Sequence, residues 1–169
     1  MFVLTYPHSR FCFTNKDAPA NLTAYVFRGS DGARPLYSGG TGLLNSIPET
    51  IENITQIQSH FRGENRIGKR IVHAYISLDG DEAKLAANDF QKLSCYAESV
   101  SQYYFQMGFV NFFCIWEIPE GYEIHYCISS VNRFWGNKLE CTEAVRGAHE
   151  EDVEWLFRWM FGTPALVHE

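Results

Sequence analysis

A carboxylate and an imidazole stand two positions apart in the second half of the chain, at Glu123 and His125. Both belong to the largely apolar run 122–131, which predicts a β-strand. Side chains two positions apart point to the same face of a strand, so this pair should lie side by side. Carboxylate oxygen and imidazole nitrogen are ligands of divalent cations such as Mg²⁺ and Mn²⁺, which makes the pair a candidate metal site. An ordinary polar pair on a sheet has the same spacing.

Basic residues offer a second candidate site, for nucleic acid. The chain carries 14 Lys and Arg against 20 Asp and Glu, and its formal net charge of −6 opposes a general affinity for phosphate backbones. Any nucleic-acid site must therefore be local, although a solvated basic loop would have the same composition. Trp135 lies in a turn-like stretch and is a candidate for stacking on unpaired bases. The candidate DNA-binding residues are Arg62, Arg66, Lys69, Arg70, Arg133, Trp135 and Lys138.

Several periodic segments would position these residues. Ser46 and Glu49 have capping-box spacing and predict a helix that ends near Gly63. A buried strand is expected over 70–78, a long helix over 81–106 and a last helix over 150–161. The runs 109–117 and 122–131 flank a Pro-Glu-Gly turn and predict an antiparallel hairpin.

The remaining segments are less regular. The first dozen residues suit a short edge strand or hairpin, residues 21–28 suit either a helix or a strand, and the glycine-rich stretch 29–42 suits a loop. The order of elements predicts an α+β fold with a central antiparallel sheet and helices mainly on one face.

The composition is that of one packed domain spanning residues 1–169. Hydrophobic residues make up 46% of the chain and aromatic residues 15%, which excludes a disordered polar chain. No apolar run approaches the ~20 residues of a membrane-spanning helix, and the start lacks the features of a signal peptide. The five cysteines are scattered and read as free thiols. We therefore expect a cytoplasmic protein with no membrane partner.

The segment from Glu123 to Lys138 resembles the hallmark of relaxases, the DNA-nicking domains of plasmid mobilisation in the HUH endonuclease superfamily. The family segment reads His-x-His, three apolar residues, Asn-Ser-Val-Asn, an aromatic residue and Gly-Lys-Lys. Here it reads Glu-Ile-His-Tyr-Cys-Ile-Ser-Ser-Val-Asn-Arg-Phe-Trp-Gly-Asn-Lys. Residues 68–79 are similar to the family's Gly-Arg, His and Ser-Phe strand, and residues 24–27 fall where mobilisation relaxases carry their tyrosine. The resemblance covers about residues 20–140.

The resemblance implies a nucleophilic tyrosine at Tyr25 and a metal ligand at His125. Relaxases attack a DNA phosphodiester with a tyrosine hydroxyl, while a divalent cation held by three histidines polarises the phosphate. Glu123 replaces the first of these histidines, and the third aligns with Trp116, whose polar neighbour is Glu117. A site for Mg²⁺ or Mn²⁺ would then comprise Glu117, Glu123 and His125, although strand alternation turns Glu117 to the other face unless a bulge intervenes.

One further histidine falls within the resemblance. His73 is either a positioning group near the substrate, which makes it a catalytic candidate with Tyr25, or a core histidine of the buried strand.

Three functions remain open at this point. The first is a relaxase-like domain that binds single-stranded DNA and nicks and rejoins it through Tyr25 during mobilisation of a plasmid or mobile element, with other mobilisation proteins as partners. The second is a degenerate relative, without a bound metal, that binds DNA or protein. The third is an unrelated small α+β enzyme or ligand-binding module.

Overall fold

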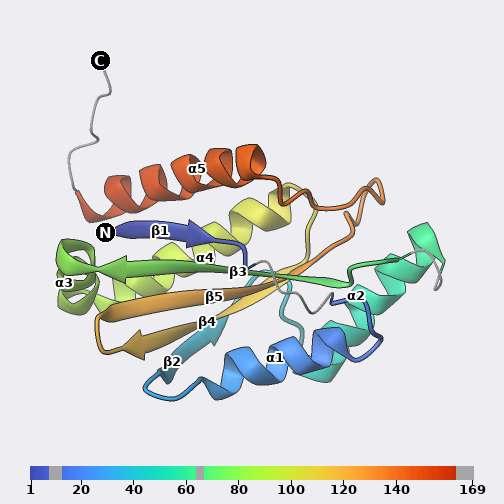
Figure 1. Ribbon diagram of the computed structural model, residues 1–169, viewed down its shortest axis with the longest axis horizontal. Helices are drawn as coiled ribbons and strands as arrows, with labels where there is room; N and C mark the ends of the chain where they lie inside the picture. The colour runs from blue at the N-terminus through green and yellow to red at the C-terminus, as the bar shows by residue number, and fades with distance from the viewer. Residues whose placement is uncertain (8–12, 64–66, 163–169) are drawn as a thin grey trace.

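A five-stranded antiparallel sheet forms the centre of the computed structural model, which describes residues 1–7, 13–63 and 67–162 (Figure 1). The strands lie in the order β1-β3-β5-β4-β2, so that β3, β5 and β4 are flanked on both sides. Their bounds are β1 Phe2–Thr5, β2 Arg34–Gly39, β3 Ile71–Asp79, β4 Asn111–Ile118 and β5 Gly121–Ser129. The predicted α+β class with a central antiparallel sheet is confirmed.

The β4–β5 hairpin is formed as the sequence predicts. In its register, Trp116 lies opposite Glu123 and Cys114 lies opposite His125. Gly121 has a φ of +154°, and a Cβ atom there would stand 2.2 Å from the carbonyl oxygen of Leu78. Glycine is therefore required at the point where β5 leaves the turn beside β3.

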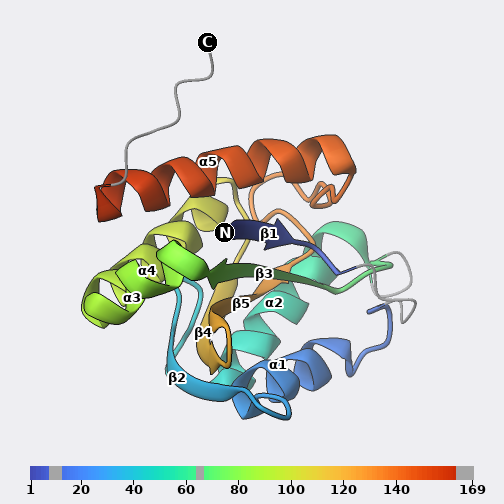
Figure 2. The ribbon, with the colours of Figure 1, turned by 60° about the vertical axis from the view of Figure 1, so that its left-hand side comes forward.

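Helices cover both faces of the sheet, as the two views show (Figure 2). On one face, α1 (Ala18–Arg28) and α2 (Ile47–Arg62) bury a cluster that includes Val26, Ile54 and Trp116. On the other face, α3 (Gly80–Asn88), α4 (Phe90–Gln106) and α5 (Glu143–Phe161) enclose a larger cluster around Tyr96 and Tyr126. The larger share of the described helices thus lies on one face, and the second face is also covered because the central strands are apolar on both sides.

Three segments differ from their predicted form. The long helix expected over 81–106 is divided at Asp89, whose backbone is non-helical and whose Oδ1 accepts a hydrogen bond from the Lys92 N–H at 2.9 Å to cap α4. The last helix begins seven residues earlier than expected, at Glu143, where Thr142 Oγ1 caps it. The glycine-rich stretch includes the edge strand β2, which pairs with β4.

The structure confirms one further predicted segment and decides between the two forms that were open for another. Ser46 Oγ accepts a hydrogen bond from the Glu49 N–H at 3.3 Å, which confirms the predicted start of α2. Residues 21–28, which suited either a helix or a strand, belong to the helix α1.

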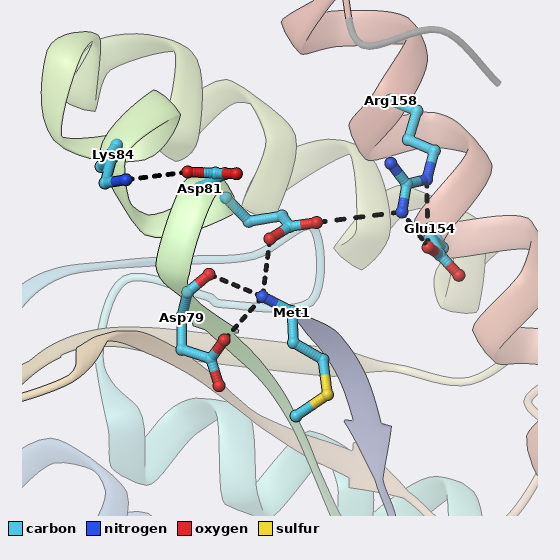
Figure 3. Close-up of polar contacts among 7 residues, drawn as sticks. Met1, Asp79, Asp81, Lys84, Glu154 and Arg158 are labelled. Atoms are coloured by element: carbon cyan, nitrogen blue, oxygen red, sulfur yellow. Dashed lines mark hydrogen bonds and ion pairs between the residues drawn. The ribbon is translucent and has the colours of Figure 1, made fainter. Parts of the chain in front are cut away.

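The first strand is tied to three neighbouring elements by a network of charges (Figure 3). The amino group of Met1 lies 2.6 Å from Asp79 Oδ1, at the end of β3, and 2.6 Å from Glu82 Oε2, on α3. The other oxygen of Glu82 lies 3.8 Å from Arg158 of α5, which also pairs with Glu154 at 2.6 Å. These contacts hold β1 along the edge of β3 and beneath α5 (Figure 1).

Two sequence predictions concern the membrane and the cysteines. Within the described ranges, no helix is both long and apolar enough to cross a bilayer. Cys95, Cys114, Cys127 and Cys141 are free thiols, and two of them are buried. Cys12 and Arg66 lie outside the described residues.

Candidate functional site

A pocket of about 520 Å³ opens on the face of the sheet that carries α1. Its lining combines one tyrosine of α1 with side chains of β3 and β5, and we call it the Tyr25 pocket. Its volume is within the range of ligand-binding clefts. The lining residues are Pro7, Phe13, Asn21, Leu22, Tyr25, His73, Tyr75, Glu123 and His125.

Helix α1 places Tyr25 at the mouth of this pocket. Leu22 and Val26 are buried against the sheet, whereas Tyr25, on the flank of the helix, keeps 39% of its surface exposed. The Tyr25 ring meets Trp116 edge-on with centroids 5.4 Å apart, and it meets His73 at 6.1 Å. The indole N–H of Trp116 donates to the carbonyl of Val26 at 2.7 Å. This bond fixes the end of α1 to the sheet and so fixes the position of Tyr25.

A hydrogen-bonded chain of three side chains forms the polar side of the pocket. His73 Nε2 is hydrogen-bonded to His125 Nδ1 at 2.9 Å, and His125 Nε2 is hydrogen-bonded to Glu123 Oε2 at 2.8 Å. Ser77 Oγ donates to the second oxygen of Glu123 at 3.4 Å. The strand register makes this possible, because Tyr75 of β3 lies opposite His125 and Ser77 lies opposite Glu123. Both ring nitrogens of His125 are thus hydrogen-bonded within the protein.

Burial governs the protonation of the pocket. It lowers the pKa of His73 to about 3, with a smaller contribution from the charge of His125, so His73 is neutral near pH 7. Burial also raises the pKa of Tyr25 above its usual value, and the charge of Glu123 and the neighbouring Tyr75 add to that rise. Tyr25 therefore stays a neutral phenol in the resting site.

Trp116 occupies the place that the resemblance gives to the third histidine. Its ring is stacked on that of His125, with centroids 3.8 Å apart and planes inclined by 28°, and only 1% of the residue is exposed. Glu117 is the next residue on β4 and points to the opposite face, where it pairs with Arg34 at 2.6 Å. Of the expected metal ligands, the structure brings Glu123 and His125 together and leaves Glu117 apart. No bulge turns Glu117 toward the pocket, since β4 and β5 pair without a register shift.

The donor atoms of the expected metal site are bonded to one another. Nε2 of His73, both ring nitrogens of His125 and one oxygen of Glu123 form these bonds, and an indole covers the face of His125. Among the described residues, no group of three or more His, Cys, Asp or Glu side chains is arranged to hold a metal ion. No chemical step is therefore assigned to a metal.

The basic residues gather near the start of β3, where several bond to backbone carbonyls. Arg62 Nε donates to Gly136 O at 3.0 Å, Arg70 Nε donates to Thr14 O at 3.0 Å, and Lys138 Nζ donates to Ile67 O at 2.5 Å and to the carbonyl of Lys69. Burial, together with the nearby charges of Arg62, Arg70 and Lys69, lowers the pKa of Lys138 to about 8. The structure thus brings four of the predicted DNA-binding cations together.

The other two described candidates lie in the turn that follows β5. The guanidinium of Arg133 lies between two rings, 3.7 Å from the centroid of Phe105 and 4.3 Å from that of Phe134. This stacking gives Arg133 a structural role in the turn. Trp135, in contrast, is 82% exposed.

Sequence reasoning missed the contribution of Tyr75 and the anchoring role of Trp116. The ring of Tyr75 is stacked on His125 with centroids 5.2 Å apart, on the side of the pocket formed by β3. A signal for Trp116 was present, because a hairpin centred on residues 119–120 places position 116 opposite position 123. Its hydrogen bond to α1 depends on the packing of a distant helix, for which the sequence holds no local signal.

Comparisons of the chain with protein-family models, with curated proteins and with solved structures found no match. The resemblance to relaxases therefore rests on the sequence motifs alone.

Proposed function

We propose that this chain is a relaxase-like domain that binds single-stranded DNA at the Tyr25 pocket, as part of the mobilisation of a plasmid or mobile element. One observation carries the proposal. The positions that the resemblance aligns with the relaxase tyrosine, the upstream histidine and the three metal ligands meet on one face of an antiparallel sheet: Tyr25, His73, Trp116, Glu123 and His125. These residues come from four separate elements, α1, β3, β4 and β5, which the fold brings together.

The chemistry of the pocket favours an unpaired strand over a duplex. Tyr25 and Tyr75 present aromatic rings on which a base can stack, which is the usual way to hold a single strand without reading its sequence. The phosphates can approach Lys69, whose Nζ lies 5.9 Å from the ring of Phe13 at the pocket wall. With a net charge of −6, the whole domain gains little from long-range attraction, so binding is weak and sensitive to salt.

A second candidate is cleavage of the strand by Tyr25, favoured by the partial exposure of its phenol in this pocket. The phenol oxygen attacks phosphorus, the bond to the 3′-oxygen breaks with its electron pair, and a 5′-phosphotyrosyl bond and a 3′-hydroxyl result. The phenol proton passes to Glu123, which lines the same pocket, and the departing oxygen takes a proton from water. The raised pKa of Tyr25 and the indole of Trp116 favour binding without cleavage.

The binding proposal is tested by titrating labelled single-stranded and duplex oligonucleotides at low and moderate salt. We expect saturable binding of the single strand that weakens steeply with salt, and a loss of about fivefold or more in Tyr25→Ala. Glu117→Gln is the matched control, because it removes a carboxylate from the opposite face of the same sheet. Equal affinity for duplex, or no binding at low salt, contradicts the proposal.

Cleavage is tested separately by denaturing electrophoresis after incubation of the protein with a labelled single strand. A covalent adduct in the wild type that is lost in Tyr25→Phe supports the second candidate. Intact DNA together with normal binding supports a binding module. An adduct that survives Tyr25→Phe shows that another residue is the nucleophile.

A further inference from the structure

A second aromatic site lies where the turn after β5 meets the C-terminal end of α2. Trp135 is 82% exposed and Phe61 is 37% exposed, and the two contribute to a shallow cavity of about 240 Å³. Its other described lining residues are Arg62 and Gly136. We call this surface the Phe61–Trp135 platform. Neither ring belongs to the lining of the Tyr25 pocket.

The turn that carries Trp135 is held in one conformation by Asn132. The side-chain oxygen of Asn132 accepts from the backbone N–H groups of Phe134, at 2.8 Å, and Trp135, at 3.1 Å. Its side-chain nitrogen donates to the carbonyl of Met107 at 2.8 Å. The N–H of Gly136 closes the turn on the carbonyl of Asn132 at 2.9 Å. The exposed indole is therefore presented by a rigid backbone.

The turn is also fixed to α2. Arg62 Nε donates to the carbonyl of Gly136 at 3.0 Å. Gly136 has a φ of +71°, and a Cβ atom at this position would stand 2.6 Å from Cδ1 of Phe61. The close approach of the Gly136 backbone to the Phe61 ring sets the distance between the turn and the helix. A ligand that stacks here meets an ordered surface and loses little free energy in ordering it.

Positive charge connects the platform to the Tyr25 pocket. Arg62 lines the platform, Lys138 Nζ bonds to the carbonyl of Lys69, and the Lys69 ammonium lies over Phe13 at the wall of the pocket. Exposed tryptophans elsewhere have a different setting. Trp159 on α5 is stacked with Trp155, which lies one helical turn from the exposed acidic residues Glu151 and Asp152, and these repel phosphate.

We propose that the Phe61–Trp135 platform is a subsite that stacks an unpaired nucleobase of the strand bound at the Tyr25 pocket. The identity of the ligand rests on the proposed function, whereas the position of the subsite rests on the geometry of the turn and α2. The base lies against the exposed indole, and the phosphates on the way to the Tyr25 pocket pass the cations Arg62 and Lys69. Stacking on an indole accepts every base, so the subsite adds affinity and little sequence preference.

The test compares the affinities of four variants for a labelled (dT)₁₅ strand. Trp135→Ala is expected to raise Kd by about fivefold or more, the lower end of what one base–aromatic stack contributes. Trp135→Phe keeps an aromatic ring and should retain most of the affinity. Trp159→Ala is the matched control, since it removes an exposed tryptophan of α5 and should leave Kd unchanged. Phe61→Leu, which keeps an apolar contact to Gly136, should weaken binding if the ring itself contacts the base.

The outcomes separate this proposal from the function of the Tyr25 pocket. An unchanged Kd in Trp135→Ala overturns the platform, even if Tyr25→Ala weakens binding. Weaker binding in Trp135→Ala with no effect of Tyr25→Ala supports the platform and contradicts the role of the pocket. Absence of binding by the wild type overturns both. Thermal unfolding of each variant confirms that the exposed substitutions leave the fold intact.

Discussion

The ring of Trp116 is stacked on the ring of His125, with centroids 3.8 Å apart and planes inclined by 28°. Trp116 also faces Glu123 across the hairpin. Positions 116, 123 and 125 therefore surround one point, the condition under which histidines at all three positions can share a metal ion. The indole of Trp116 occupies the position at which the resemblance to relaxases predicts the third histidine.

Restoring the three histidines should create a metal site. The double substitution Trp116→His and Glu123→His is expected to raise the affinity for Mn²⁺ at least tenfold over the wild type, measured by calorimetry or electron paramagnetic resonance. The pair Glu117→His and Glu123→His is the control, because position 117 faces the other side of the sheet. Equal Mn²⁺ affinity in the two double variants would show that the strand geometry is not what decides metal binding.

Acid should destabilise the fold through its buried histidines. Burial lowers the pKa of His73 to about 3 and lowers the pKa of His149 below its usual value, while Asp152 partly offsets the shift of His149. Below about pH 6.5 these histidines bind protons in the unfolded chain but not in the folded chain. As the pH falls, each of them lowers the free energy of unfolding by up to ~1.4 kcal/mol per pH unit. Above about pH 6.5 these two residues contribute no pH dependence.

Urea unfolding at pH 7, 5 and 4 measures this effect. His73→Asn removes the titrating group but keeps a polar side chain, so it should flatten the decline. A slope between pH 6 and 4 that is unchanged in this variant would indicate that carboxylates, not His73, cause the loss of stability.

Gly136→Ala should lower both stability and affinity for single-stranded DNA. An alanine at a φ of +71° is strained by about 1 kcal/mol, and its Cβ atom would also displace the Phe61 ring. Gly63→Ala is the matched control, since Gly63 has a φ of +64° with no atom within 4 Å of the added Cβ. We expect Gly63→Ala to lose stability alone. If both variants bind DNA as the wild type does, the conformation of the turn at Gly136 does not determine binding at the platform.

Tyr6→Phe should destabilise the fold without affecting the Tyr25 pocket directly. The hydroxyl of Tyr6 is hydrogen-bonded to that of Tyr104 at 2.5 Å and to His149 Nδ1 at 2.8 Å, in a buried cluster between β1, α4 and α5. Its removal leaves a buried hydroxyl and a buried ring nitrogen short of a partner, at a cost of ~1–3 kcal/mol. Chemical denaturation measures the change. A loss below about 0.5 kcal/mol would mean that the remaining groups find other partners.

Local sequence signals account for much of the fold. Helix α2 follows from its capping serine and apolar spacing, and the β4–β5 hairpin follows from two apolar runs around a turn. The division between α3 and α4 was missed because the apolar spacing continues across Asp89 while the backbone does not. Strand β2 was missed because it contains glycine and proline, which have low β propensity. It forms because it pairs with β4.

The candidate site was predictable in its residues but not in its bonding. Alternation along β5 places Glu123 and His125 on one face, and the same alternation removes Glu117 from it. The bond between His73 and His125 depends on the register of β3 against β5, which a single sequence does not reveal. The buried state of Trp116 likewise depends on how α1 packs on the sheet.

Because of its hydrogen bond to Val26, the Trp116 side chain has two structural roles that a histidine at this position could not both fill. The indole anchors the helix that carries the candidate nucleophile, and it also fills the place of a metal ligand. A single exchange of Trp116 for histidine would loosen the helix before any metal could compensate, so substitutions in α1 and β4 should be strongly non-additive. Conversion of this chain into a metal-dependent nuclease would thus require changes in α1 that replace this anchor, in addition to the new ligands.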